Sequence, residues 1–172
     1  MFEKRIEHHF KVSMLIILAI ASIPLVFQPN LYGQEESQRL SRGVFVADLE
    51  PRAASNATGL AAFELVGDDQ MSYTINASGV SDISTIALAY STGGRSTDII
   101  QFHSSSRDGI ITAPINGTVA SGNFTSADFT GNPLRGGTMA DLVKRIADGQ
   151  IFVRIGTTAF PLGEVIGKVA VI

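Results

Sequence analysis

Cysteine and tryptophan are both absent from the 172-residue chain. Without cysteine the protein can form no disulfide, carry out no thiol catalysis and build no cysteine-ligated metal site. Small exported domains, below about 80 residues, commonly depend on disulfides, but a chain of this length buries roughly two-thirds of its unfolded surface. A hydrophobic core therefore suffices to hold the fold together.

Clusters of basic residues are also missing. Residues 34–172 contain ten Lys or Arg and 14 Asp or Glu, a net charge of −4, and the arginines are scattered among the acids. Proteins that bind nucleic acid gather Lys and Arg on one face and stack bases on aromatic side chains. The composition therefore argues against nucleic acid as a partner.

One long apolar run is present, close to the N-terminus. Residues 12–27 carry no charge and follow Lys4, Arg5 and Lys11. A basic start before a short apolar core is typical of a signal peptide, and this run is shorter than the about 20 residues of a spanning helix. We expect residues 1–33 to be a signal peptide, with an uncleaved N-terminal membrane anchor as the alternative.

The rest of the chain is expected to lie outside the cytoplasmic membrane. Residues 34–43 are polar and predict a linker, and residues 44–172 predict the folded domain, secreted or at the cell surface. Membrane contact is expected only through the N-terminal segment, if it is not cleaved. Candidate N-glycosylation sequons support export and occur at Asn56, Asn76, Asn116 and Asn123. About one such match would arise by chance in a domain this rich in Ser and Thr, so the excess indicates a glycosylated surface protein.

Short apolar segments separated by turn residues predict many strands. Several show the period-2 alternation of a half-buried strand. The expected strands are 44–49, 58–66, 71–77, 83–90, 98–103, 110–115, 118–124, 151–155 and 165–172. A Gly-Asp-Asp-Gln turn at 67–70 and the dipeptide Asn116-Gly117 predict hairpins. This pattern favours an antiparallel β-sandwich or barrel.

A single helix is predicted at Met139–Ala147. Thr138 is a natural N-cap, and Asp141 three residues later completes a box-like pair at the positive end of the helix dipole. Leu142 and Ile146 are four residues apart and share one face. The helix is therefore expected to pack on the sandwich through this face.

The C-terminal stretch carries a resemblance to a known family. A strand at 151–155 leads into a corner, 157–164, and then into the last strand. The segment 142–169 resembles the C-terminal part of the CHRD (chordin) domain, and the segment 58–90 resembles the upstream strands of the same domain family. The signature residues that match are Phe160, Pro161, Gly163, Glu164 and Gly167. The resemblance implies an antiparallel immunoglobulin-like β-sandwich with one short helix near the C-terminus, an extracellular location and no established enzymatic activity.

The chain departs from this family at its histidines. Members commonly carry a His-x-His pair where this chain has Leu88 and Tyr90, a histidine in place of Gly156 and an arginine in place of Ile166. Three histidines would suit zinc or copper. Because His103 is the one histidine left in the exported part, the departures imply neither a metal nor another cofactor here.

Three weaker patterns suggest chemistry. His103 stands close to serines 104–106 and Asp108, but a Ser-His-Asp relay requires groups that converge in space beside an oxyanion hole. Residues 131–138 imitate a phosphate-binding loop with glycine in place of its lysine, so we expect a loop that delivers the N-cap. The acidic pairs 35–36 and 68–69 lack calcium-loop spacing and predict solvated turns.

Arg154 interrupts an otherwise apolar strand. If its side chain faces inward it must pair, and Glu164 is the expected partner. If it faces outward, it belongs to the polar face of the strand. Both alternatives stay open at this stage.

The sequence thus favours a non-enzymatic domain over an enzyme. We expect a structural, adhesive or partner-binding role towards an extracellular protein or a surface polymer. The alternative is an exported copper- or zinc-binding or redox-related domain on the same β-sandwich.

Overall fold

The computed structural model describes residues 43–52 and 54–172. The predicted signal peptide or anchor at 1–33, and all of the predicted linker except Gly43, lie outside the described residues. In the part of the chain that is described, none of the helices has the length and apolar character needed to cross a membrane.

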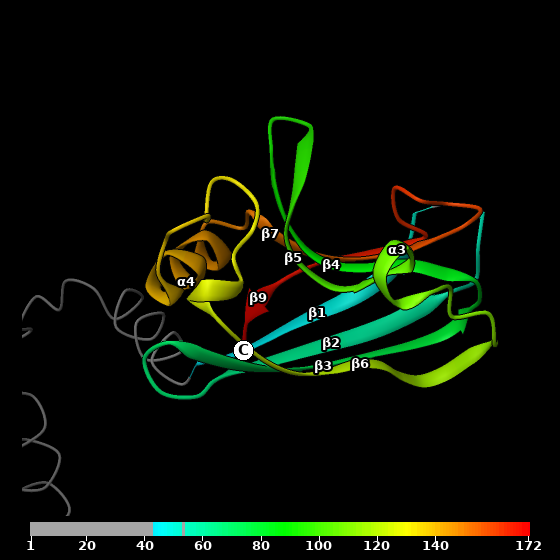
Figure 1. Cartoon of the computed structure of the whole chain (residues 1–172), viewed down its shortest axis with the longest axis horizontal. Coiled ribbons are helices and arrows are strands. Elements are labelled where there is room, and N and C mark those ends of the chain that lie inside the picture. The colour runs from blue at the N-terminus through cyan, green and yellow to red at the C-terminus, as the bar shows by residue number, and fades with distance from the viewer. Residues whose placement is uncertain (1–42, 53) are drawn as a thin grey trace, which may run out of the picture. The chain divides into compact units, whose positions relative to one another are not determined.

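The described strands form a curled antiparallel sheet whose two halves face each other (Figure 1). The first half-sheet contains β1 (Val44–Pro51), β2 (Thr58–Leu65), β3 (Gln70–Val80), β6 (Ile115–Thr125) and β9 (Ala170–Val171). The second half-sheet contains β4 (Ile83–Thr92), β5 (Arg95–Ser104), β7 (Ile151–Thr157) and β8 (Val165–Lys168). Strand order across the curl is β5-β4-β7-β8-β1-β2-β3-β6.

Strand β1 connects the two half-sheets. Its residues 44–49 pair with β2, whereas Glu50 and Pro51 pair with Ile166 and Val165 of β8. The short strand β9 pairs with the first part of β1 at Phe45 and Val46. The C-terminal strands β8 and β9 therefore both pair with β1, which joins the two half-sheets into one curled sheet with edges at β5 and β6.

The core lies between the half-sheets and follows the alternation of the strands. Phe45, Phe63 and Met71 point inward from the first half-sheet, and Leu88 and Val153 point inward from the second. All five side chains are at most 2% exposed. Because successive residues of a strand face opposite sides, the polar residues between them form two outer faces.

Helix α4 (Met139–Ala147) has the predicted bounds and the predicted cap. The Asp141 amide donates to Oγ1 of Thr138 over 3.2 Å, and the Thr138 amide donates to Oδ2 of Asp141 over 2.8 Å. The helix buries Leu142 and Ile146 in the core. Both halves of the capping box are present, and the one-face packing prediction is confirmed.

Two local predictions are wrong. Asn116-Gly117 does not turn the chain, because both residues lie within β6 and pair with Ser78 and Ala77 of β3, in a ladder that has two register shifts. Oδ1 of Asn116 accepts hydrogen bonds from the Ser78 hydroxyl and the Gly79 amide, which hold it in the ladder. The expected strand at 110–115 reduces to one bridge between Ile111 and Ile83.

The segment after β5, expected as a turn, forms one helical turn, α3 (Ser105–Asp108), and a 3-10 turn, η1 (Ser126–Asp128), follows β6. The hairpin between β2 and β3 is confirmed by their register. The structure confirms the predicted all-β antiparallel class with α4 near the C-terminus.

Candidate functional site

The loop between β7 and β8 is a tight corner held by its own hydrogen bonds. The Phe160 amide donates to Oγ1 of Thr157 over 3.1 Å, and the Gly163 amide donates to the Phe160 carbonyl over 3.0 Å. Gly163 has φ +122°, in the region that favours glycine, and an added Cβ would lie 2.7 Å from the Ile166 side chain. The corner therefore presents Leu162, which is 80% exposed, in a fixed position.

Glu164 ends this corner and is almost fully buried. Its Oε1 accepts a hydrogen bond from the Ser55 hydroxyl over 2.6 Å. Its amide donates to the Ile155 carbonyl, and its carbonyl accepts from the Arg52 amide, each over 2.8 Å. A buried carboxylate needs such partners, and here they join the corner to the segment that follows β1.

Arg154 pairs with Asp98 and not with Glu164. Its Nη2 lies 2.6 Å from Oδ2 of Asp98, and its Nη1 donates to the Pro161 carbonyl over 2.9 Å. Arg154 is paired in register with Ile166, on the outer face of the second half-sheet. Of the two alternatives that the sequence left open, the outward one therefore holds, because the guanidinium bonds to Asp98 on the outer face and Glu164 bonds to Ser55.

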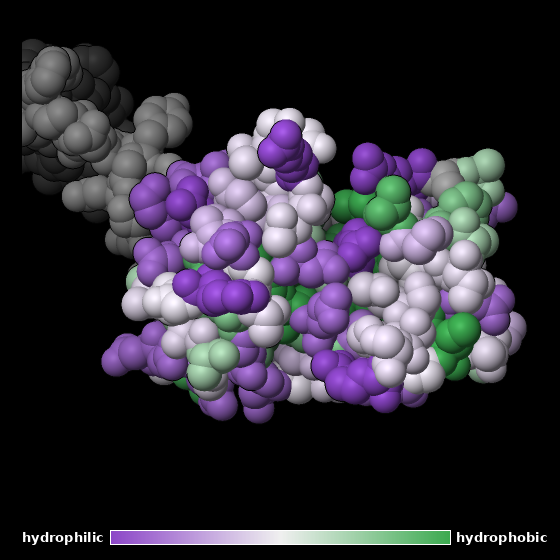
Figure 2. Space-filling view, turned by 45° about the horizontal axis from the view of Figure 1, so that its top comes forward, coloured by the Kyte–Doolittle hydropathy of each residue, from purple (hydrophilic) through white to green (hydrophobic). Residues whose placement is uncertain are grey.

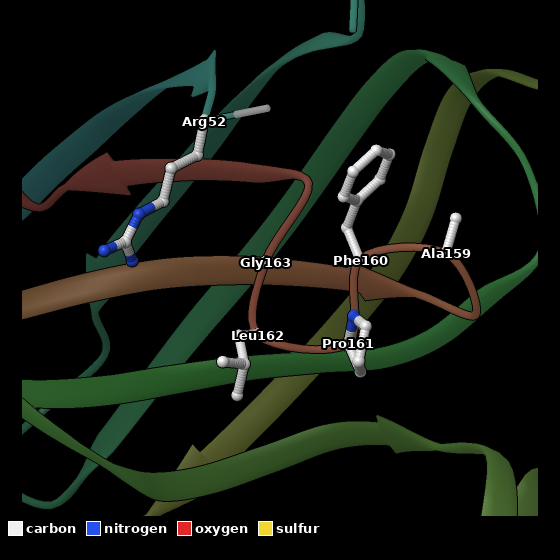
Figure 3. A pocket seen from close by; sticks show the side chains of 6 residues that line it. All are labelled: Arg52, Ala159, Phe160, Pro161, Leu162 and Gly163. Atoms are coloured by element: carbon white, nitrogen blue, oxygen red, sulfur yellow. The ribbon is translucent and has the colours of Figure 1, made fainter. Parts of the chain in front are cut away.

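Arg52 lies between two shallow pockets of about 420 Å³ and 300 Å³. We call the residues that line them the Arg52 surface: Arg52, Ala89, Ser91, Ser96, Phe152, Arg154, Ala159, Phe160, Pro161, Leu162, Gly163 and Ile166. In Figure 3 the Arg52 guanidinium extends away from Phe160 on the other side of the corner. Figure 2 shows apolar side chains exposed beside hydrophilic ones at the end of the domain that carries this corner.

The sequence did not single out this surface. Arg52 was one of several scattered arginines, and Asp98 and Ser91 belonged to an expected strand and loop. Their proximity depends on strand register, since Ser91 pairs with Ser96 and Ala89 pairs with Asp98. No local sequence motif predicts such a cross-strand arrangement.

His103 and its neighbours do not form a catalytic relay. Nδ1 of His103 lies 3.6 Å from Oδ2 of Asp108, while its Nε2 is buried without a hydrogen-bond partner among the described residues. The hydroxyls of Ser104 and Ser106 bond to each other over 2.9 Å. A relay requires a serine hydroxyl at the free imidazole nitrogen, and none is bonded there.

Asp108 instead forms an ion pair. Hydrogen bonds from the Arg107 side chain, and then from the Ser104 amide, lower the pKa of Asp108 to about 2. The guanidinium makes contacts of 2.9 Å and 2.8 Å to the two carboxylate oxygens. A bidentate pair of this kind stabilises the charged carboxylate, so this cluster orders α3.

The loop that imitates a phosphate site delivers the cap of α4. The Gly137 amide donates to the Leu134 carbonyl over 2.8 Å, and Thr138 caps the helix. Of the acidic pairs, Asp69 accepts from the Ser126 amide over 3.3 Å, and the pair at 35–36 lies outside the described residues. Among residues 43–52 and 54–172 there is no group of three His, Cys, Asp or Glu that could hold a metal ion.

Three of the predicted sequon asparagines lie on one outer face. Asn76 of β3 pairs with Thr118, and Asn116 and Asn123 of β6 pair with Ser78 and Ser72. These positions alternate with the inward-facing residues of both strands, which places them on the outer face of the first half-sheet. Asn56 is exposed just before β2. The sequons thus lie on the half-sheet that does not carry the pocket of Ser91 and Ser96.

A family model, the CHRD domain, matches residues 30–169. The chain belongs to the CHRD domain family. No curated protein and no solved structure matches it. The match covers the signature residues predicted from the sequence, which lie in the β7–β8 corner and in β8: Phe160, Pro161, Gly163, Glu164 and Gly167.

The three positions at which members of the CHRD domain family were said to carry histidine, Leu88, Tyr90 and Gly156, do not share one face in this chain. Leu88 and Tyr90 pair with Val153 and Ile151 on the core side. Gly156 lies two residues after Arg154 on the outer face of β7, and Ile166 of β8 pairs with Arg154 on the same face. Tyr90 packs beneath the Arg145 guanidinium, which lies 5.6 Å from its ring centroid. In this chain the three histidine positions therefore lie on opposite sides of the second half-sheet.

Proposed function

We propose that this CHRD domain is a non-enzymatic extracellular or cell-surface domain that binds a partner through the Arg52 surface. An immunoglobulin-like sandwich would be its scaffold, and N-linked glycans would cover its first half-sheet. The observation that carries the proposal is the separation of the two outer faces: three sequons lie on one, and the pockets around Arg52 lie on and beside the other.

The chemistry of the Arg52 surface supports binding rather than catalysis. Leu162 is 80% exposed and Phe160 is 38% exposed, and both are held by a hydrogen-bonded corner next to an arginine. Exposed apolar side chains beside an arginine are common at recognition surfaces. CHRD domains occur in extracellular proteins, which supports a partner outside the cell.

The sequon face supports the same division of roles. The outward side chains of β3 and β6 that face each other across the ladder are Ser, Thr, Asn and Gln, without a charged residue. Glycans attached there would make this face hydrophilic and would leave the opposite face accessible. We therefore assign recognition to the second half-sheet and its corner.

The alternative of an exported copper, zinc or redox domain has less support. Its ligands would have to come from His103 and carboxylates, and these residues are not gathered in groups of three anywhere in the described ranges. Metal analysis of the untagged chain tests it. Stoichiometric copper or zinc would overturn the proposed function.

The proposed role is tested by retention of the full chain on an extract of the surface of its source cells. Leu162→Ser should weaken retention, because it removes the most exposed apolar side chain of the corner. Leu60→Ser is the matched control, since Leu60 is 44% exposed and is paired with Asn76 on the sequon face. Equal retention of the two variants, or a larger loss with Leu60→Ser, would contradict the assignment.

A further inference from the structure

We propose that the pocket of Arg52, Ser91 and Ser96 binds an acidic saccharide, and that Arg52 binds its carboxylate. This inference rests on the proposed function, because it names the class of partner that the Arg52 surface takes. It is carried by the difference between two arginines, by the floor of the pocket and by the hydroxyl groups at its rim.

The two arginines at this pocket differ in what they already bind. Arg154 is held by Asp98 and by the Pro161 carbonyl, and its side chain is only 16% exposed. Arg52 is exposed, and its guanidinium makes no hydrogen bond or ion pair with residues of the described ranges. Its main chain is fixed, since its amide donates to the Glu164 carbonyl. Arg52 is thus the cation available to a ligand.

The floor of the pocket is largely apolar, with Ala89, Phe152 and Ile166 among its lining residues. Ala89 pairs with Phe152, and Ile166 pairs with Arg154, so their side chains lie on one face of adjoining strands. Ala89 is 1% exposed and pairs with Asp98 on its other side. A shallow apolar strip beside an aromatic ring suits the C–H face of a sugar, which packs as other apolar surface does.

The rim supplies groups that suit sugar hydroxyls. Ser91 and Ser96 pair directly across β4 and β5 on the outer face. A serine hydroxyl both donates and accepts, as does each hydroxyl of a sugar. The guanidinium of Arg52 supplies a planar fork that matches a carboxylate. The pocket, about 300 Å³, is at the small end of the range for ligand sites, which suits one sugar unit of a longer polymer.

An acidic peptide fits this place less well. Peptides that join a sheet usually add as a strand to a free edge. The pocket lies mainly over β4, β7 and β8, which are paired on both sides, and of its lining residues only Ser96 comes from an edge strand, β5. A ligand here must therefore lie on the face of the sheet and use side chains alone.

The test is a calorimetric titration of the full chain with an oligogalacturonate at low salt. The wild type should bind it, and the fully methyl-esterified oligomer should bind about tenfold or more weakly, because the charge-assisted hydrogen bonds are lost. Arg52→Gln should weaken binding of the acid form by a similar factor. Arg52→Lys should fall between, since it retains the charge without the fork.

Arg95→Gln is the matched control, because Arg95 is an exposed arginine of β5 outside the pocket. It should bind as the wild type does. Urea unfolding should show Arg52→Gln to be as stable as the wild type, which excludes loss of fold as the cause. Equal binding of acid and ester, equal binding by Arg52→Gln and wild type, or equal competition by poly-glutamate would each overturn the saccharide assignment.

The two proposals fail in distinguishable ways. A chain that is retained by the surface extract but does not bind the oligogalacturonate refutes this inference and leaves the proposed function standing. A chain that is retained by neither, under the same conditions, refutes both. If a sulfated oligosaccharide binds more tightly than the uronate, then the group that Arg52 binds is a sulfate. This outcome would overturn the carboxylate assignment.

Discussion

Nη2 of Arg154 donates to Oδ2 of Asp98 over 2.6 Å, so that β7 is tied to the edge strand β5 across β4. The small side chain of Ala89 makes this possible, because Ala89 pairs with Asp98 on one side and with Phe152, next to Arg154, on the other. The ion pair therefore spans β4 where the outward residues of this strand, Ala87 and Ala89, have small side chains.

A double-mutant cycle should detect this pair. Both side chains are partly buried, at 16% and 21% exposure, so Asp98→Ala should cost about 1–2 kcal/mol of unfolding free energy, and the Asp98/Arg154 coupling should exceed about 0.5 kcal/mol. The matched cycle of Glu164 with Arg154 should couple within about 0.3 kcal/mol, because Glu164 bonds to Ser55. Urea denaturation measures both. A larger coupling in the second cycle would restore the pair expected from the sequence.

What the sequence predicted well depends on neighbours along the chain. The cap of α4 by Thr138 and Asp141 follows from a spacing of three residues, and the β7–β8 corner follows from Pro161 and Gly163. Such local chemistry is present in the sequence whatever the fold. The antiparallel class could be inferred for the same reason.

What the sequence could not predict depends on register. Asp98 is 56 residues from Arg154, and only the pairing of β5, β4 and β7 brings them together. Asn116-Gly117 has the preference of a hairpin turn, but ten ladder pairs with β3 outweigh that preference. Tertiary pairing overrides local propensity in such cases, and the Arg52 surface is assembled in the same non-local way.

Gly167→Ala should destabilise the domain strongly. An added Cβ would meet the Asp48 carbonyl and the Leu49 side chain, because β8 packs directly onto β1 at this residue. The backbone cannot move aside without breaking the register of β8 with β7, so we expect a loss of about 1–3 kcal/mol or more. Lys168→Ala, at an exposed neighbour in the same strand, is the control and should change stability by less than about 0.5 kcal/mol. Similar urea midpoints for the two variants would contradict the close packing of β8 on β1.

Stability should fall at low pH partly because of Asp108. Hydrogen bonds from the Arg107 side chain, and then from the Ser104 amide, lower its pKa from the ordinary range of an aspartate to about 2. A group whose folded pKa is depressed stabilises the fold above its unfolded pKa, and this contribution is lost as pH falls through the folded value. Asp108→Asn should therefore lessen the decline in thermal midpoint between about pH 4 and pH 2. Thermal scans across this range measure it, and an unchanged decline would remove Asp108 as a source.

The sequon face should carry glycans and should not take part in recognition. In a host that attaches N-linked glycans, the mass of the secreted chain should fall when Asn76, Asn116 or Asn123 is changed to Gln, because all three lie on an outer face. Asn132→Gln is the control, since Asn132 precedes Pro133 and is outside any sequon, and its mass should show no glycan loss. Thr118 belongs to the sequon of Asn116 and donates to Asn76, and Ser78 belongs to the sequon of Asn76 and donates to Asn116. The two sequons therefore bond to each other. Because this face is opposite the pocket of the Arg52 surface, the three variants, each of which lacks one sequon, should be retained by the surface extract as well as the wild type. Loss of retention in all three would place recognition on the first half-sheet instead.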